Sequence, residues 1–134
     1  MLLAALWGGL LLCIALVAAP SAFAVLDRVQ AGLVVSRLFA LEANISLAAS
    51  LLLLLIERRL AQAMGSSLLS ATMLLPAGAL FCTVAGYYAL QPLMIAARAG
   101  QGGWSFSTLH ALSFGFFGLK TLLVLILAWR SSKA

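Results

Sequence analysis

Charged side chains are scarce in this chain of 134 residues. Only 8% of its residues are Asp, Glu, Lys or Arg, whereas 65% are hydrophobic, and its mean hydropathy is +1.18. A soluble domain is typically about half apolar and about a quarter charged. Too little polar surface is present to cover a water-soluble globule, so the composition predicts an integral membrane protein.

Clusters of basic residues are missing as well. Eight Lys and Arg against three Asp and Glu give a net charge of +5, but the basic residues are spread thinly and flank the apolar segments, as charges at the ends of membrane spans do. No run could follow a phosphate backbone, so we expect no nucleic-acid partner. The expected partners are the lipid bilayer and other membrane-protein subunits.

The chain also has few of the residues from which active sites are built. One His, two Cys and three acidic residues form no nucleophile–base triad, no pair of catalytic carboxylates and no glycine-rich phosphate loop. Cys13 and Cys82 lie in separate apolar runs and lack metal or redox spacing. We predict no enzyme, no cofactor and no metal site. His110 could supply one axial haem ligand, but a lone His on an apolar helix is more often structural.

Long apolar segments are what the sequence does contain. A bilayer core of ~30 Å takes ~20 helical residues, and the hydropathy pattern predicts transmembrane helices at about 2–25, 36–56, 68–90 and 106–129. Short connections between them favour an antiparallel four-helix bundle. The expected fold is therefore all-α, with a single transmembrane domain over residues 1–134 and no soluble domain.

The first segment has a competing interpretation as a secretory signal peptide. Residues 1–26 carry no charge, and Ala22-Phe23-Ala24 has the form of a small-x-small cleavage site. Against this, the start of the segment has no Lys or Arg, and the apolar run is longer than a signal-peptide core. We interpret it as the first transmembrane helix, with Pro20 near its end, where a lost backbone hydrogen bond is more easily tolerated.

Two further patterns concern packing and orientation. In lipid, small residues spaced four apart mark the faces where helices touch, and each helix offers such a stripe. The stripes are Ala5, Gly9 and Cys13; Ser46 and Ser50; Gly78, Cys82 and Gly86; and Ser107, Ala111 and Gly115.

The distribution of basic residues favours both termini in the cytoplasm, because four lie on the terminal side and three on the other, partly offset by Asp27. The basic residues are Arg58, Arg59, Arg130 and Lys133 against Arg28, Arg37 and Arg98.

Ionisable side chains inside the spans mark a candidate site, because they are costly in the membrane. Glu42 and His110 each lie about four to six residues into their predicted helices, so we expect them at one level, with Arg37 above and Asn44 about half a turn deeper. These four residues form a predicted polar cluster at one mouth of the bundle. A Glu–His or Glu–Arg hydrogen bond would offset the cost of burying the carboxylate. The cluster is either an internal clasp that fixes helix register or a proton- or cation-responsive site.

Lys120 lies deeper in the last helix, ten residues before Arg130, or ~15 Å from that end. No carboxylate is expected at its level, because Glu57 belongs at the membrane interface. Its side chain then snorkels towards the terminal side, or it faces a cavity or an acidic group of a partner. We therefore predict Lys120 as a partner or lipid contact.

Four short stretches carry a resemblance to known proteins: Leu6-Trp7-Gly8-Gly9, Ala18-Ala19-Pro20 with Phe23, Gln91-Pro92 with Arg98, and residues 106–113. They resemble a family of small bacterial four-helix membrane proteins of unknown function. The eukaryotic relatives of that family are transmembrane proteins associated with platinum-drug resistance, and copper-resistance and haem-associated membrane proteins are more distantly similar. The resemblance implies the four-helix fold and a multi-pass location in the bacterial inner membrane, but no settled activity. It singles out Pro20, Phe106, His110 and Ser113.

Two functional hypotheses follow. The first is a non-enzymatic structural or accessory subunit packed laterally against a larger membrane complex, which the small-residue stripes, the short loops and an unpaired Lys120 favour. The second is a small transporter or binding protein for a cation or metal that uses the predicted polar cluster of Arg37, Glu42, Asn44 and His110.

Overall fold

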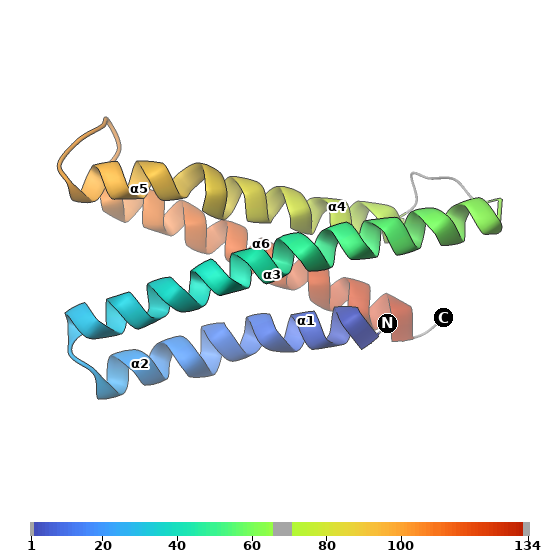
Figure 1. Cartoon of the computed structure of the whole chain (residues 1–134), viewed down its shortest axis with the longest axis horizontal. Coiled ribbons are helices and arrows are strands. Elements are labelled where there is room, and N and C mark those ends of the chain that lie inside the picture. Colours follow the sequence, from blue (N-terminus) through green and yellow to red (C-terminus); the bar gives the residue numbers. More distant parts are fainter. Residues whose placement is uncertain (1, 66–70, 133–134) are drawn as a thin grey trace.

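The computed structural model describes residues 2–65 and 71–132, and within them every regular element is helical. Two short π-helical segments, η1 and η2, continue the α-helices on either side of them, so the eight elements form four long helices (Figure 1). All four are long and apolar enough to cross a membrane, which confirms the predicted all-α bundle. The elements are α1 (Leu2–Cys13), η1 (Ile14–Ala18), α2 (Ala19–Val25), α3 (Arg28–Ala63), α4 (Ala71–Thr83), η2 (Val84–Ala89), α5 (Leu90–Arg98) and α6 (Phe106–Ser132).

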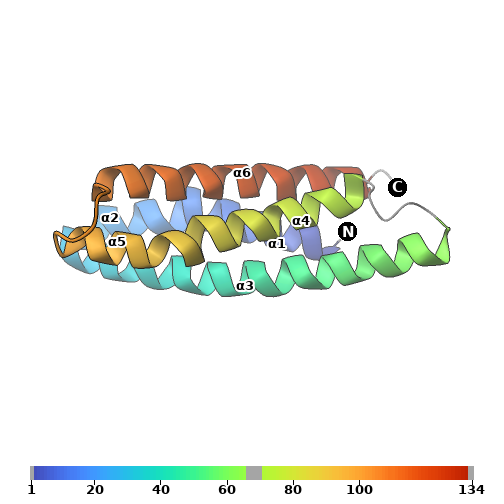
Figure 2. The same ribbon diagram turned by 90° about the horizontal axis from the view of Figure 1, so that it is seen from above.

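The four long helices run antiparallel. α1 begins and α6 ends at one end of the bundle, which we call the terminal end, whereas the 26–27 turn and the 99–105 loop lie at the opposite end (Figures 1 and 2). α3 is the longest helix and extends past its neighbours at the terminal end (Figure 2).

The second long helix differs from its predicted bounds. α3 begins at Arg28 rather than at residue 36 and ends at Ala63 rather than at residue 56. Its start is set by Asp27, whose carboxylate accepts a hydrogen bond from the Gln30 backbone N–H at 2.7 Å and so caps the first turn. The charged cluster at residues 57–59 does not end the helix, because Glu and Arg are good helix formers once the chain leaves the apolar region.

The third long helix continues past Gln91-Pro92 to Arg98. A proline inside a helix removes one N–H and crowds the preceding turn, and the wider π-helical segment η2 ends at Ala89, three residues before Pro92. The segment η1 ends at Ala18, two residues before Pro20. Pro76 also lies inside this helix, in α4. The predicted start of this helix at residue 68 falls outside the described residues.

The bundle is closed at the terminal end and open at the other. In the closed half, α1 packs against α3 and α6, and α4 packs against the same two helices. In the open half, α2 packs against α3 and α5 against α6, and the described backbones of these two hairpins stay apart. The closed half holds the apolar core of Ala4, Trp7, Leu11, Ala49, Leu53, Ala79, Val124 and Leu127.

The predicted small-residue stripes are half right. On α3, Ser46 and Ser50 are buried, and on the third helix Cys82 and Gly86 are buried. At Gly86 a Cβ would lie 2.5 Å from Cβ of Phe116, so the close approach to α6 requires glycine. The predicted stripes on α1 and α6 are wrong, because their small residues are exposed. On α1, large side chains such as Trp7 and Leu11 make the helix contacts instead. The exposed stripe residues are Ala5, Gly9, Cys13, Ser107, Ala111 and Gly115.

Candidate functional site

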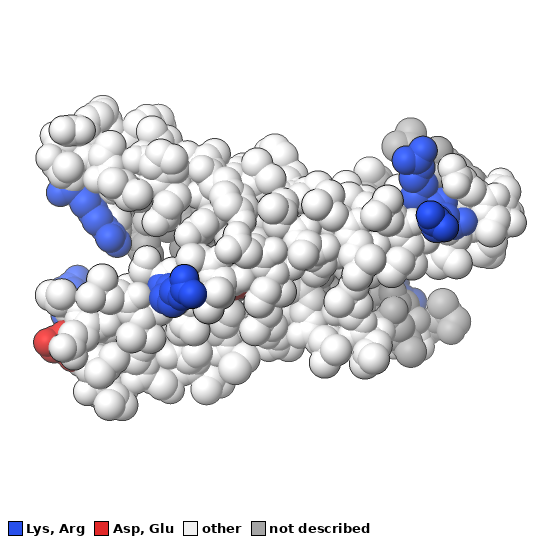
Figure 3. All heavy atoms as spheres, viewed as in Figure 1, with Lys and Arg blue, Asp and Glu red and all other residues white. Residues whose placement is uncertain are grey.

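A cavity of about 530 Å³ lies between the α2–α3 and α5–α6 hairpins in the open half of the bundle. In the space-filling view, a hollow separates the two lobes at the end opposite the termini, and basic side chains border it (Figure 3). Residues of η1, α2, α3, η2, α5 and α6 line this cavity, together with Cys82 of α4. Every long helix therefore contributes to its wall.

The mouth of the cavity is basic and aromatic. Arg28 is the first residue of α3 and Arg98 the last of α5, so the helix ends place one arginine on each hairpin. The Arg98 guanidinium carbon lies 4.6 Å from the centroid of the Phe106 ring. The same ring stacks on His110, with centroids 5.8 Å apart and planes 18° apart. Phe106 thus orients two of the nitrogen-bearing groups at the mouth.

The walls deeper in the cavity are largely apolar. Phe39 of α3 and Phe117 of α6 meet edge to face across the hairpins, with ring centroids 5.3 Å apart. Met94 and Ile95 of α5 complete the apolar lining with Phe114. One polar contact supports the wall: Ser113 donates a hydrogen bond of 2.9 Å to the carbonyl oxygen of Gly86, which belongs to the π-helical segment η2.

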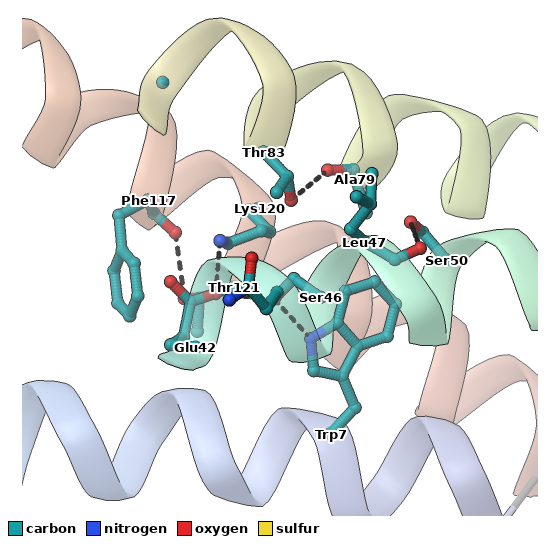
Figure 4. Close-up of polar contacts among 12 residues, drawn as sticks. Trp7, Glu42, Ser46, Leu47, Ser50, Ala79, Thr83, Phe117, Lys120 and Thr121 are labelled. Atoms are coloured by element: carbon teal, nitrogen blue, oxygen red, sulfur yellow. Dashed lines mark hydrogen bonds and ion pairs between the residues drawn. The ribbon is translucent and has the colours of Figure 1, made fainter. Parts of the chain in front are cut away.

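The floor of the cavity is an ion pair between Glu42 of α3 and Lys120 of α6 (Figure 4). Lys120 Nζ donates to Glu42 Oε1, and the two residues are only 3% and 2% exposed. They are the innermost lining residues of their helices, directly before the closed core begins. The pair therefore stands at the point where the open and closed halves meet.

A chain of hydrogen bonds extends the ion pair into the closed half. Ser46, one turn further along α3, donates to Glu42 Oε1 at 2.5 Å and accepts from Trp7 Nε1 at 2.9 Å (Figure 4). Ser46 is fully buried and Trp7 is 2% exposed. The network therefore joins α1, α3 and α6, and the Ser46 hydroxyl acts in it as both donor and acceptor.

Equal distances from the helix starts explain why Glu42 and Lys120 meet. Glu42 is fourteen residues past Arg28 and Lys120 is fourteen residues past Phe106. Both helices start at the open end, so each side chain lies ~21 Å along its helix at ~1.5 Å per residue. The prediction that Lys120 has no carboxylate at its level is wrong, because α3 begins at its Asp27 cap, eight residues before the predicted start.

The predicted polar cluster is not brought together as one group. Glu42 and His110 both line the cavity, but His110 is exposed at the mouth and Glu42 is buried at the floor. The expected hydrogen bond between Glu42 and His110 or Arg37 is absent, and the Glu42 carboxylate instead accepts from Lys120 and Ser46. Asn44 accepts a hydrogen bond from the Tyr88 hydroxyl at 2.5 Å. Arg37 is exposed on α3, outside the cavity lining.

The charges around the cavity favour anions over cations. Arg28, Arg98 and Lys120 line it against a single carboxylate, Glu42, so these four side chains give an excess of two positive charges. Among the described residues there is no group of three or more His, Cys, Asp and Glu side chains that could hold a metal ion. The arrangement is suited to holding a negatively charged group near the mouth beside an apolar interior.

Sequence reasoning missed three parts of this site, and two of them had a signal. Asp27 is an N-cap residue type directly before the helix, and starting α3 there would have placed Glu42 and Lys120 at one depth. Arg28 and Arg98 were assigned only to membrane topology, although helix ends on neighbouring hairpins meet in an antiparallel bundle. The link from Ser46 to Trp7 had no signal in the sequence, because Ser46 also fitted a packing stripe.

Fold and site together define the class: a four-span membrane protein with a buried intramembrane ion pair at the floor of a cavity. The family described as Domain of unknown function (DUF4149) matches residues 2–102, and the chain belongs to that family. The match covers α1 to α5 but not the Phe106–Ser113 stretch of the resemblance described above. No curated protein matches the chain, and no solved structure does. The relationship to eukaryotic platinum-resistance proteins stays a prediction.

Proposed function

We propose that this chain is a non-enzymatic membrane protein that binds a small molecule in the cavity between its hairpins, above the Glu42–Lys120 ion pair. The observation that carries the proposal is the cavity itself. Its volume of about 530 Å³ lies within the range of ~300–1,000 Å³ that ligand sites occupy. It also combines largely apolar walls with a few convergent polar groups, which is the usual composition of such sites.

The ion pair supports a site at this position rather than a packing defect. Taking two charges out of water is costly, and an apolar pair of similar volume is often no less stable. Ionisable residues inside a membrane bundle are accordingly rare, and they pair with one another or face a cavity. Glu42 and Lys120 do both, because they pair with each other and line the cavity.

The proposed location is the bacterial inner membrane, with both termini in the cytoplasm. Arg58, Arg59 and Arg130 lie towards the terminal end, and the sequence count of four basic residues on this side against three on the other favours a cytoplasmic terminal end. The mouth of the cavity would then open on the opposite, extracytoplasmic side. A ligand would reach the site from outside the cell membrane or from the outer leaflet.

Cysteine accessibility tests whether the cavity is open to ligands. Ser36 of α3 and Met94 of α5 line it from opposite hairpins, and each is replaced by cysteine in a Cys13→Ser/Cys82→Ala background. We expect a charged, water-soluble maleimide to label both cysteines in the folded protein. Leu41→Cys, on the exposed outer surface of α3, should react far more slowly in lipid. Unreactive cysteines at both cavity positions would refute the proposal.

Filling the cavity provides the matched variant. A side chain at Gly32 meets open space and points into the lining, so Gly32→Trp should occupy the cavity without a clash and protect the Met94→Cys thiol. Gly118→Trp makes the same substitution at a helical glycine that also meets open space but lies outside the lining. It should leave labelling unchanged.

The two earlier hypotheses fare differently. A role as an accessory subunit remains a prediction, but Lys120 no longer supports it, because that residue is paired with Glu42. Support would return if a large partner co-purified in stoichiometric amounts in mild detergent, as shown by native gel and mass spectrometry. Binding of a cation or metal loses support because the one lining carboxylate, Glu42, is already neutralised by Lys120.

A further inference from the structure

We infer that the ligand of this cavity is an anionic single-chain amphiphile, with a carboxylate or phosphate head between Arg28 and Arg98 and its hydrocarbon chain along the apolar walls. The inference rests on the proposed function and names the chemical class of its ligand. Head and chain are argued separately below, because different residues support them.

The two mouth arginines are available to an anionic head. Among the described residues the only ion pair joins Glu42 and Lys120, so neither Arg28 nor Arg98 has a carboxylate partner there. The contact of Arg98 with the Phe106 ring is a cation–π contact and supplies no counter-charge. Guanidinium groups bind carboxylate and phosphate through paired N–H donors, and two of them on opposite hairpins can hold one head group from both sides.

The interior is suited to a hydrocarbon chain. Below the arginines the lining is largely apolar, with Phe39, Phe114 and Phe117 beside Met94 and Ile95, although Ser36, Gln91 and Ser113 also contribute to it. Charged heads are stable at the membrane surface and chains are stable in its interior. An amphiphile that lies parallel to the helices therefore meets charge at its head and a mainly apolar wall along its chain.

The shape of the opening permits entry from the bilayer. Because the two hairpins diverge, the hollow is open along the face of the bundle seen in Figure 3 as well as at its end. A ligand can thus slide in sideways while its head stays at the membrane surface. A purely water-soluble anion would need no such side opening.

The volume of the cavity matches one hydrocarbon chain. A water-sized group takes ~30 Å³, so about 530 Å³ holds on the order of 18 such groups. A chain of about a dozen carbons with its head fills this space, so a second chain would have to lie outside the cavity.

Photo-cross-linking tests the class of ligand on the full chain in nanodiscs of neutral phosphatidylcholine. The probe is a diazirine-bearing dodecanoate, and cross-linked peptides are identified by mass spectrometry. We expect labelling at residues 35–39 and 113–117, with competition by unlabelled dodecanoate and by dodecyl phosphate. Dodecyltrimethylammonium should compete at least tenfold less well, and inorganic phosphate should not compete.

Charge variants test the head-group contact. Arg28→Gln/Arg98→Gln should weaken labelling about tenfold, because both proposed anchors lose their charge. The matched control Arg58→Gln/Arg59→Gln removes two charges near the terminal end and should leave labelling unchanged. Gly32→Trp should abolish it, and Gly118→Trp should not.

Several results would overturn the inference. Equal competition by the cationic amphiphile would exclude selection by charge, and effective competition by inorganic phosphate would indicate a small anion instead. Labelling confined to outward-facing residues would indicate general lipid contact. In each of these cases, reactive cysteines at positions 36 and 94 would still support the proposed function. Unreactive cysteines would refute both the proposed function and the inference about the ligand.

Discussion

Removing one partner of the Glu42–Lys120 pair should destabilise the bundle strongly. Glu42 and Lys120 are 2% and 3% exposed, so water cannot replace the lost partner. Lys120→Met leaves the Glu42 carboxylate without its counter-charge, and Glu42→Gln leaves the ammonium of Lys120 in the same position. Breaking a buried pair in this way costs about 3–5 kcal/mol.

The double variant should be far less damaging than either single variant. In Glu42→Gln/Lys120→Met no charge remains to be buried, and replacing a whole buried pair by uncharged groups of similar volume is often neutral. The side-chain amide that this change introduces at position 42 can still accept a hydrogen bond from the Ser46 hydroxyl. We therefore expect the double variant to lie within about 1–2 kcal/mol of the native protein, so that the coupling energy of the cycle is of the order of 3–5 kcal/mol or more.

The assay is reversible unfolding in mixed micelles of dodecyl maltoside with increasing dodecyl sulfate, followed by far-UV circular dichroism. In a Trp104→Phe/Trp129→Phe background, Trp7 fluorescence gives a local signal beside the pair, since its indole N–H bonds to Ser46. Leu41→Met, a change on the exposed surface of α3, controls for the general effect of substitution. Single variants that cost less than about 1 kcal/mol, or a double variant that costs the sum of the two, would show that the pair is not coupled.

Two further stability predictions follow from neighbouring contacts. Ser46→Ala removes the hydroxyl between Trp7 and Glu42 and should cost about 1–3 kcal/mol in the same unfolding assay, because it leaves the buried indole N–H unpaired. A smaller loss would show that water replaces the hydroxyl. Gly86→Ala places a Cβ 2.5 Å from that of Phe116 and should cost about 1–3 kcal/mol by overpacking. The control Gly115→Ala meets open space on α6 and should be neutral or slightly stabilising, so an equal loss at both glycines would contradict the close approach.

The fold followed from the sequence because hydropathy alone identifies apolar segments of membrane length. In the hydrocarbon core every backbone polar group must be satisfied, so a continuous apolar segment has to be helical. Composition could not show where the helices end. α3 extends beyond its apolar part at both ends. The third helix continues past Pro92, and the π-helical segment η2 lies in the turn before it, where the hydrogen bond that proline cannot donate changes the backbone pattern.

The candidate site was predicted in part for the same reason. Glu42, His110 and Lys120 stood out because charge-bearing side chains are rare in membrane spans. Their partners depended on depth, and an eight-residue error in the start of α3 moved Glu42 by ~12 Å along the helix axis. The shift led to the prediction that Glu42 lies level with His110 and that Lys120 has no carboxylate partner, whereas the structure pairs Glu42 with Lys120.

The position of the ion pair connects the two interpretations of the intramembrane charges, clasp and site. On the terminal side of Glu42 and Lys120 lies the apolar core, where helices touch along their length. On the other side the hairpins separate around the cavity. A clasp at the middle of the bundle holds α3 and α6 together where the core ends, so the open half can stay apart without loosening the closed half. The same two charges that fix the register of the helices thereby give the cavity a floor, and one arrangement serves both purposes.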